Sequence, residues 1–389
     1  MLRFLTSGES HGRGLVSIIE GFPAQVPIDL KVINRDLKRR MAGYGRGARM
    51  KIESDQVEVI SGVRHGYTLG SPIAFVIWNR DWENWTEIMS PSFSPEGSEK
   101  RRITRPRPGH ADLPGGLKYQ FLDMRNVLER SSARETASRV AVGGFCRLLL
   151  RELGVEVYSH TIAVKDVRIS EELLANVSVD QVEQIEASEM RCVDPELNEA
   201  MKAAVDQAIE RGDTIGGEFE VRAVGVPPGL GSYVHWDRRL DGRLAQAIMS
   251  INAVKAVEVG SGLSSDPYGS QYHDEIFYDK SKREFYRRTN HAGGLEGGVT
   301  NGEEIIVRAT LKPIPTMRRP LMSVDIATKE PFKAQYERSD TCVVPAAGVI
   351  GEAMVAIVLT QALEEKFGAD TLGEIRANLE NFRELIRNL

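Results

Sequence analysis

The most apolar stretch of the chain runs from Val343 to Leu363, and it constrains the fold more than any other feature. It is broken by Pro345, Gly348, Gly351 and Glu352. It therefore contains no run of about 20 apolar residues of the kind that crosses a membrane. Because Pro345 suits the first position of a helix, we predict a helix buried inside the protein and no membrane span.

The composition is that of an ordinary globular protein. The chain has 389 residues, of which 27% are charged and 41% are hydrophobic. This length fits one large domain or two ordinary ones, and it can bury a large core without a disulfide or a metal. Its cysteines, Cys146, Cys192 and Cys342, are far apart and form no C-x-x-C pair, which argues against a disulfide framework and against a zinc site. Sparse cysteines and the lack of a signal peptide predict a reducing, cytoplasmic location.

Hydrophobic periodicity predicts a mixture of helices and strands. Short β-like runs cover residues 57–60, 73–78, 219–224 and 304–311. Helical spacing appears at Leu30, Ile33 and Leu37, at Leu197, Met201, Val205 and Ile209, and at Leu240, Leu244, Ile248 and Ile251. The sequence contains no P-loop and no G-x-G-x-x-G motif, so a kinase fold and a Rossmann fold are both unsupported. The charged, Gly-poor segment of residues 170–212 suggests a peripheral insertion.

Basic residues gather in three islands although the net charge is -5. The islands span residues 38–49, 100–107 and 125–139. An acidic chain argues against bulk nucleic-acid binding, so the islands suggest a local anion site. A solvated charged surface is the alternative, and clustering by itself does not separate the two.

The island at 100–107, with the residues just after it, and one earlier turn carry candidate catalytic side chains. In the sequence Gly8-Glu9-Ser10-His11-Gly12, glycines flank Ser10 and His11, and a histidine is a natural general acid near neutral pH. The alternative is a plain turn with an exposed histidine. In Arg105-Pro106-Arg107-Pro108-Gly109-His110, prolines stiffen a loop that carries Arg107 and His110, which resembles a site wall more than a linker. A solvated basic loop is the alternative there.

The loop after the first predicted helix carries arginines of two kinds. Arg39 and Arg40 fall in the last turn of that helix, where they favour the helix dipole without any ligand. Arg46 and Arg49 lie in a Gly-rich loop, where arginine forks can close on a phosphate or a carboxylate. An RGG-like RNA-binding segment is a weak competitor because a single tyrosine offers little stacking surface.

Three further segments combine rigidity with polar side chains. Ser132-Ala133-Arg134-Glu135 matches a capping box, and the helix start beside Arg134 is suited to an anion, although an ordinary capped core helix has the same pattern. Lys312-Pro313-Ile314-Pro315-Thr316 forms a rigid turn after a predicted strand. Asp340, near the start of the apolar helix, is a candidate proton relay or a helix cap.

Taken together, these segments resemble the chorismate synthase family from Gly8 to the helix after Pro345. The matching motifs are Gly-Glu-Ser-His-Gly, Arg-Pro-Gly-His-Ala-Asp, the run from Glu129 to Thr136 with Arg139, the run from Gly293 to Gly298, Lys-Pro-Ile-Pro-Thr, and Arg338-Ser339-Asp340. The resemblance implies conversion of 5-enolpyruvylshikimate 3-phosphate to chorismate and phosphate. This is a 1,4-anti elimination that needs reduced FMN without net redox change, and it is the last common step of the shikimate pathway.

The resemblance also implies roles for individual residues. His11 would protonate the leaving phosphate, His110 would set the protonation of the flavin, and Asp340 would relay the proton from flavin N5. The implied substrate ligands are Ser10, Arg40, Arg46, Arg49, Arg107, Ser132 and Arg134. The implied FMN contacts are Ser131, Ser132, Ala133, Asn252, Ala253, Gly297, Lys312, Pro313, Ile314, Pro315, Thr316 and Arg338.

The family fold implied is one large α/β (α+β) domain, a β-α-β-α sandwich with a helical inner layer, assembled as a homotetramer. NADPH as an indirect reductant and a separate flavin reductase are the implied redox partners. Position 341 departs from the family pattern, because it holds Thr where many members carry Pro. We expect this change to free a backbone N–H and to loosen the loop that holds Asp340.

Two other functions are the alternatives to this predicted lyase activity. A polyanion-binding or RNA-binding module would use the basic islands, but the acidic net charge and the histidines in Gly-flanked turns count against it. An ordinary flavin oxidoreductase would consume NADPH in step with product, whereas the lyase needs only a catalytic pool of reduced flavin.

Overall fold

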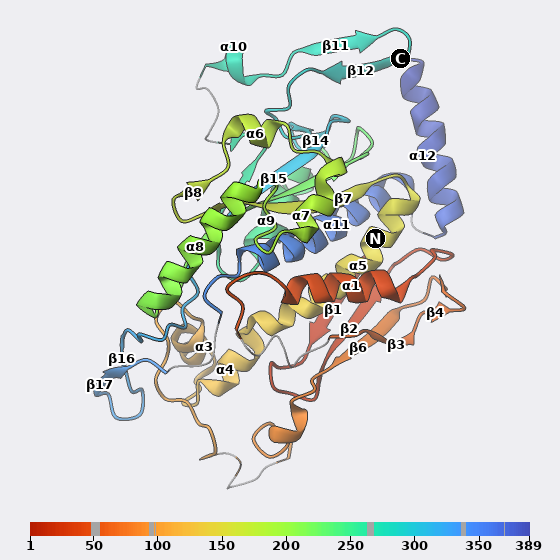
Figure 1. Cartoon of the computed structure of the whole chain (residues 1–389). Coiled ribbons are helices and arrows are strands. Elements are labelled where there is room, and N and C mark those ends of the chain that lie inside the picture. The colour runs from red at the N-terminus through yellow and green to blue at the C-terminus, as the bar shows by residue number, and fades with distance from the viewer. Residues whose placement is uncertain (48–54, 93–96, 98, 263–267, 336–339, 369) are drawn as a thin grey trace.

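Two antiparallel sheets enclose a layer of helices in the computed structural model, and further helices cover the outer face of the second sheet (Figure 1). The structure describes residues 1–47, 55–92, 97, 99–262, 268–335, 340–368 and 370–389. This arrangement confirms the predicted β-α-β-α sandwich with a helical inner layer.

The first sheet has the strand order β1-β2-β6-β3. Its strands are β1 (Arg3–Ser7), β2 (Gly14–Glu20), β6 (Ile73–Trp78) and β3 (Glu58–Ser61). Along β2 the side chains alternate between buried and exposed, so one face of the sheet lies against the helices and the other faces outward. Two small hairpin strands, β4 (Val63–Arg64) and β5 (Tyr67–Thr68), follow β3.

The second sheet has the strand order β10-β15-β9-β7-β8. Its strands are β10 (Val254–Val259), β15 (Ile305–Leu311), β9 (Gly217–Val224), β7 (Glu156–Val164) and β8 (Val167–Arg168). The strand β7 is buried along nearly its whole length because helices pack on both of its faces. The strands predicted at 57–60, 73–78, 219–224 and 304–311 are all confirmed, with end shifts of one or two residues.

The inner layer consists of α1 (Leu30–Met41), α5 (Thr136–Glu152), α9 (Leu240–Met249) and α11 (Val344–Phe367). Helix α5 packs on β1, β2 and α11, and α11 in turn packs on β7 and β9. At the crossing of α5 and α11, a Cβ added at Gly143 would lie 2.3 Å from the Cβ of Ala353. The small residues therefore permit a close approach that larger side chains would prevent.

Helix α11 is the apolar stretch that the sequence singles out. By length and composition it could cross a membrane, but 94% of its most apolar window is buried inside the protein. One of its charged residues, Glu352, is fully buried and receives hydrogen bonds from Arg39, Arg147 and Arg191. The prediction of a buried core helix is confirmed, and the interrupting carboxylate ties α11 to its neighbours.

Shorter elements surround this framework. Residues 170–212 fold into α6 (Glu171–Ala175), α7 (Val182–Ala187) and α8 (Pro195–Arg211), and α8 packs on β7 and β8. That placement on the outside suits the predicted insertion, which stays a prediction. The remaining elements are α3 (Asp112–Tyr119), α4 (Arg125–Ser131), α10 (Gly269–Tyr272), β11 (Ile276–Asp279), β12 (Glu284–Arg287), β13 (Leu295–Glu296), β14 (Val299–Thr300), β16 (Met322–Val324), β17 (Pro331–Lys333) and α12 (Leu372–Arg387).

Candidate active site

A cavity of about 1090 Å³ opens where α5 and α11 begin and where α9 ends. Segments that are far apart in the sequence form its wall. They are the turn after β1, the segment at 81–85, the loop at 101–111, α4 with the start of α5, residues 250–253, the loop after β15 and the segment before α11. The elements of the inner layer therefore converge on one concave site.

Most of the predicted site residues line this cavity. They are Ser10, His11, Arg107, His110, Ser131, Ser132, Ala133, Asn252, Ala253, Lys312, Ile314, Pro315, Thr316 and Asp340. Arg49 and Arg338 lie outside the described residues. Arg40, Arg46, Arg134, Gly297 and Pro313 do not line the cavity.

Arg40 and Arg134 lie behind the cavity wall. Arg40 is 4% exposed and donates through Nη2 to Asp55 at 3.0 Å. Arg134 is 6% exposed, donates through Nη1 to the Asp55 carboxylate at 2.5 and 2.6 Å, and also bonds Asn79. Both guanidiniums share this buried carboxylate, and their contact with the substrate stays a prediction. Their ion pairs with Asp55 support the cavity wall from behind it.

Gly297 and Pro313 also lie away from the cavity. Gly297 sits in the turn between β13 and β14 with φ +59°, next to Tyr233. Pro313 faces a separate cavity of about 410 Å³ beside α8. The other four residues of the 312–316 turn line the active-site cavity.

Asp340 lines the cavity and is held by the loop after α1. Its carboxylate pairs with Arg46 Nη1 at 2.8 Å and accepts the Gly47 N–H at 2.6 Å. Helix α11 begins at Val344 with Val343 in the cap position, so the alternative that Asp340 caps this helix is wrong.

The residue that departs from the family pattern adds a contact to the same loop. The backbone N–H of Thr341 donates to the carbonyl oxygen of Gly45 at 2.8 Å, and a proline there could not make this bond. The expected loosening at position 341 is therefore offset by a hydrogen bond that joins the Asp340 loop to the Arg46 loop.

His11 is a partly buried member of the cavity wall rather than an exposed turn residue. Its side chain is 13% exposed and stacks on Trp85 with ring centroids 3.8 Å apart. Its Nδ1 lies 2.9 and 3.0 Å from the two oxygens of Glu129. The turn that presents it needs Gly8, because at φ +106° an added Cβ would lie 2.4 Å from the Gly14 carbonyl oxygen.

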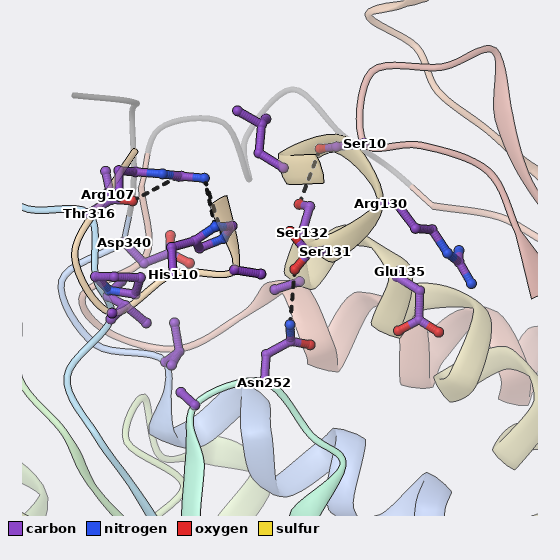
Figure 2. Close-up of a pocket in the computed structure, with 18 of the residues that line it drawn as sticks. Ser10, Arg107, His110, Arg130, Ser131, Ser132, Glu135, Asn252, Thr316 and Asp340 are labelled. Atoms are coloured by element: carbon purple, nitrogen blue, oxygen red, sulfur yellow. Dashed lines mark hydrogen bonds between the residues drawn. The ribbon is translucent and has the colours of Figure 1, made fainter. Parts of the chain in front are cut away.

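His110 faces the same cavity with an equivalent partner. Its Nδ1 lies 2.6 Å from Oδ1 of the fully buried Asp112, whose other oxygen accepts from Arg107 Nε at 2.8 Å. Burial would raise the pKa of Asp112, but hydrogen bonds from His110 and Arg107 hold that pKa well below its usual value. Arg107 also donates to Thr316 at 3.1 Å, a contact visible in Figure 2. The predicted stiff loop is thus held by the contacts of His110 and Arg107 with Asp112 and of Arg107 with Thr316.

The opposite wall is built from the α4–α5 junction and the end of α9. Ser132 Oγ accepts from the Arg134 N–H at 3.2 Å and bonds the Ser10 hydroxyl at 3.3 Å, while Asn252 donates to the Ser131 carbonyl (Figure 2). Ser132 is therefore the expected cap. Glu135 does not complete the capping box, because its carboxylate bonds Thr6 and Arg139.

Sequence reasoning missed several residues of the cavity wall. They are Asp81, Trp85, Arg101, Arg130, Glu135 and Arg139. The basic members fall inside the islands at 100–107 and 125–139, so the clustering of charge was the available signal. Asp81 and Trp85 carry no motif, and only the folded chain brings them to His11.

This geometry defines a class of protein. Cationic side chains bring positive charge to a concave site that also holds two histidines, each paired with a buried carboxylate. Among the described residues no cluster of His, Cys, Asp and Glu is arranged to hold a metal ion. Such a site is suited to binding a small anionic molecule and to transferring protons on it.

Comparisons with known proteins narrow the class. The family description "Chorismate synthase" matches residues 2–363. Chorismate synthases of Solibacter usitatus and Alkaliphilus metalliredigens are 55% and 54% identical, covering 100% and 98% of this chain and 100% and 99% of their own lengths. A crystal structure of chorismate synthase superposes with a TM-score of 0.81 at 42% identity, covering 100% of this chain and 99% of that one. The chain belongs to the chorismate synthase family, and it is a lyase.

Proposed function

We propose that this enzyme converts 5-enolpyruvylshikimate 3-phosphate to chorismate and phosphate by a 1,4-anti elimination that needs reduced FMN. This would be the last common step of the shikimate pathway to the aromatic amino acids. The observation that carries the proposal is the pair of carboxylate-bound histidines, His11 and His110, in one cavity lined by arginines.

The charge of the cavity wall suits this substrate. Two carboxylates and a phosphate need several cationic partners, and the wall offers Arg101, Arg107, Arg130, Arg139 and Lys312. Arginine forks bind such groups through paired, charge-assisted hydrogen bonds. We propose that these side chains bind the substrate, and that Arg40, Arg46 and Arg134 support the wall through Asp55 and Asp340.

The cavity also suits a flavin beside the substrate. Its volume of about 1090 Å³ exceeds the upper end of the usual range for a single small ligand. The uncharged residues Ser131 to Ala133, Asn252 and Ala253 line the site together with the cationic Lys312, whose backbone N–H donates to the Ala253 carbonyl oxygen at 3.0 Å. When bound there, reduced FMN would supply electron density as the phosphate leaves and would take up the hydrogen that the substrate loses.

The protein's own residues would handle charge and protons. His11 would donate a proton to the leaving phosphate oxygen, and His110, held by Asp112, would set the protonation of the flavin. Asp340 would accept the proton released at the end of the cycle and pass it to solvent, because Arg46 and the Gly47 N–H hold its carboxylate at the cavity edge. Closure of the substrate over the wall would exclude water.

Cellular context forms the last part of the proposal. We propose a cytoplasmic homotetramer whose flavin is reduced by a separate flavin reductase, with NADPH as the indirect source of electrons. Three free, buried cysteines suit a reducing compartment. Exposed apolar side chains on the outer face of the first sheet, including Leu5, Ile18 and Trp78, suit burial against another subunit.

The test is direct conversion under anaerobic conditions. Protein with dithionite-reduced FMN is given 5-enolpyruvylshikimate 3-phosphate while phosphate release and chorismate absorbance are followed. We expect product with reduced FMN and none with oxidised FMN. Folded protein that binds flavin but forms no chorismate would refute the proposal.

A further inference from the structure

Glu129 on α4 is hydrogen-bonded to the turn that carries His11 through both its carboxylate and its backbone carbonyl. One carboxylate oxygen accepts the His11 backbone N–H at 2.9 Å, and both oxygens lie within 3.0 Å of His11 Nδ1. The backbone carbonyl of Glu129 accepts the Ser10 N–H at 2.9 Å. The position of the whole Ser10–His11 turn therefore depends on this residue.

The carboxylate of Glu129 is buried and ionised. Its side chain is 2% exposed, and Arg125 Nη1 donates to it at 2.8 Å. Burial would raise the pKa of Glu129, but the contacts with His11 and the charge of Arg125 lower it. An ionised carboxylate can only accept hydrogen bonds, so His11 Nδ1 must be the donor. The ring nitrogen left for proton exchange is Nε2, on the edge of the ring away from Glu129.

We propose that Glu129 is a positioning residue that holds His11 in the Nδ1–H form and turns Nε2 toward the cavity. The role of His11 as the acid rests on the proposed function, whereas its tautomer does not. Trp85 fixes the plane of the ring by stacking on it at an interplanar angle of 25°.

Several other charged groups lie around the His11 ring. Arg125 and Arg130 lie on α4, Arg101 lies 4.2 Å from the Trp85 ring, Asp81 bonds Trp85 Nε1, and Glu9 lies in the same turn as His11. Of these groups, Glu129 is the one whose carboxylate is hydrogen-bonded to His11 Nδ1, so it sets which ring nitrogen carries the proton.

The first test observes the unaltered protein. The chain has 7 histidines, so solid-state ¹⁵N NMR of protein labelled only at histidine is tractable, and His11→Asn assigns the signal. We expect neutral His11 in the Nδ1–H form, which is the minority tautomer of free histidine. A neutral His11 in the Nε2–H form would overturn the proposal. Because this measurement needs no substrate, it stays separate from any failure of the proposed reaction.

The second test removes the charge but keeps the shape. Glu129→Gln should add an Nε2–H population at neutral His11, because the amide N–H can donate to Nδ1, and it should lower turnover. Glu129→Asp keeps an acceptor-only carboxylate, so His11 should stay in the Nδ1–H form although turnover falls. Glu87→Gln, which breaks an exposed pair with Lys100, is the matched control. A Glu129→Gln variant with reduced turnover but an unchanged His11 tautomer would mean that Glu129 is merely structural.

Discussion

Replacing Glu352 with Gln should destabilise the protein strongly, because this carboxylate is the common partner of three buried arginines. Its oxygens accept from Arg39 at 2.7 and 2.8 Å, from Arg147 at 3.0 Å and from Arg191 at 3.1 Å. The neutral amide keeps the shape of the side chain, but it removes the negative charge that balances these guanidiniums. It also points an N–H group at one of them. Breaking a buried ion pair costs about 3–5 kcal/mol.

Asp36 reduces this cost without removing it. It bonds Arg39 at 3.0 Å and Arg147 at 2.8 Å, and these two arginines also keep Glu186 and Glu156 respectively, whereas Arg191 keeps only the partly exposed Glu186. We therefore expect a loss near the lower end, about 3 kcal/mol.

The pH dependence supplies a second readout. Burial alone would raise the pKa of Glu352, but the charges of Arg39, Arg147 and Arg191 hold it at about 2. This stabilising contribution is therefore fully present above pH 4.5 and is lost as the pH falls from 4.5 toward 2. The Gln variant should lack this component of the acid destabilisation.

The assay is urea denaturation of both proteins at pH 7 and across the acid range. Glu380→Gln, which removes an exposed partner of Arg383, is the control and should shift the free energy of unfolding by less than about 0.5 kcal/mol. A Glu352→Gln variant with the same midpoint as the control would refute the account of α11.

The remaining predictions concern the site and the core. His11→Ala should abolish most turnover while flavin affinity, measured by fluorescence titration, stays nearly unchanged. Arg107→Ala should raise KM for the phosphorylated substrate by about tenfold or more in steady-state kinetics, because charge-assisted bonds of about 1.5–3 kcal/mol are lost. Gly143→Ala should lower the free energy of unfolding, measured by urea denaturation, by about 1–3 kcal/mol, because the new methyl group meets Ala353. Burial raises the pKa of Glu364 to about 7, so its stabilising contribution falls as the pH rises from 4.5 to 7, and Glu364→Gln should be more stable than the unaltered protein at pH 8.

Much of the fold follows from local patterns. The spacing of Leu30, Ile33 and Leu37 predicts α1, and the apolar run that Glu352 interrupts predicts the buried α11. These signals suffice because helix periodicity and burial are properties of short windows. The layered sandwich itself came from the resemblance to the family, since strand order depends on pairings across the whole chain.

The site is harder to derive because its contacts join distant residues. The sequence marks Arg40 and Arg134 as candidate ligands, but it does not reveal that Asp55 lies between them. In the same way, Glu129 belongs to one of the matching motifs, yet its contact with His11 spans 118 positions. The basic islands suggest an anion site, and only the folded chain separates arginines on the wall from arginines behind it.

The central claim is that the enzyme is a lyase that uses reduced flavin catalytically, and stoichiometry tests it most directly. The measurement counts the phosphate and chorismate formed per molecule of reduced FMN and per electron pair supplied, in one anaerobic reaction. We predict many molecules of each product per flavin, in equal amounts and with no matching consumption of reductant. One electron pair consumed for every product molecule would contradict the lyase and identify a hydride-transferring oxidoreductase instead.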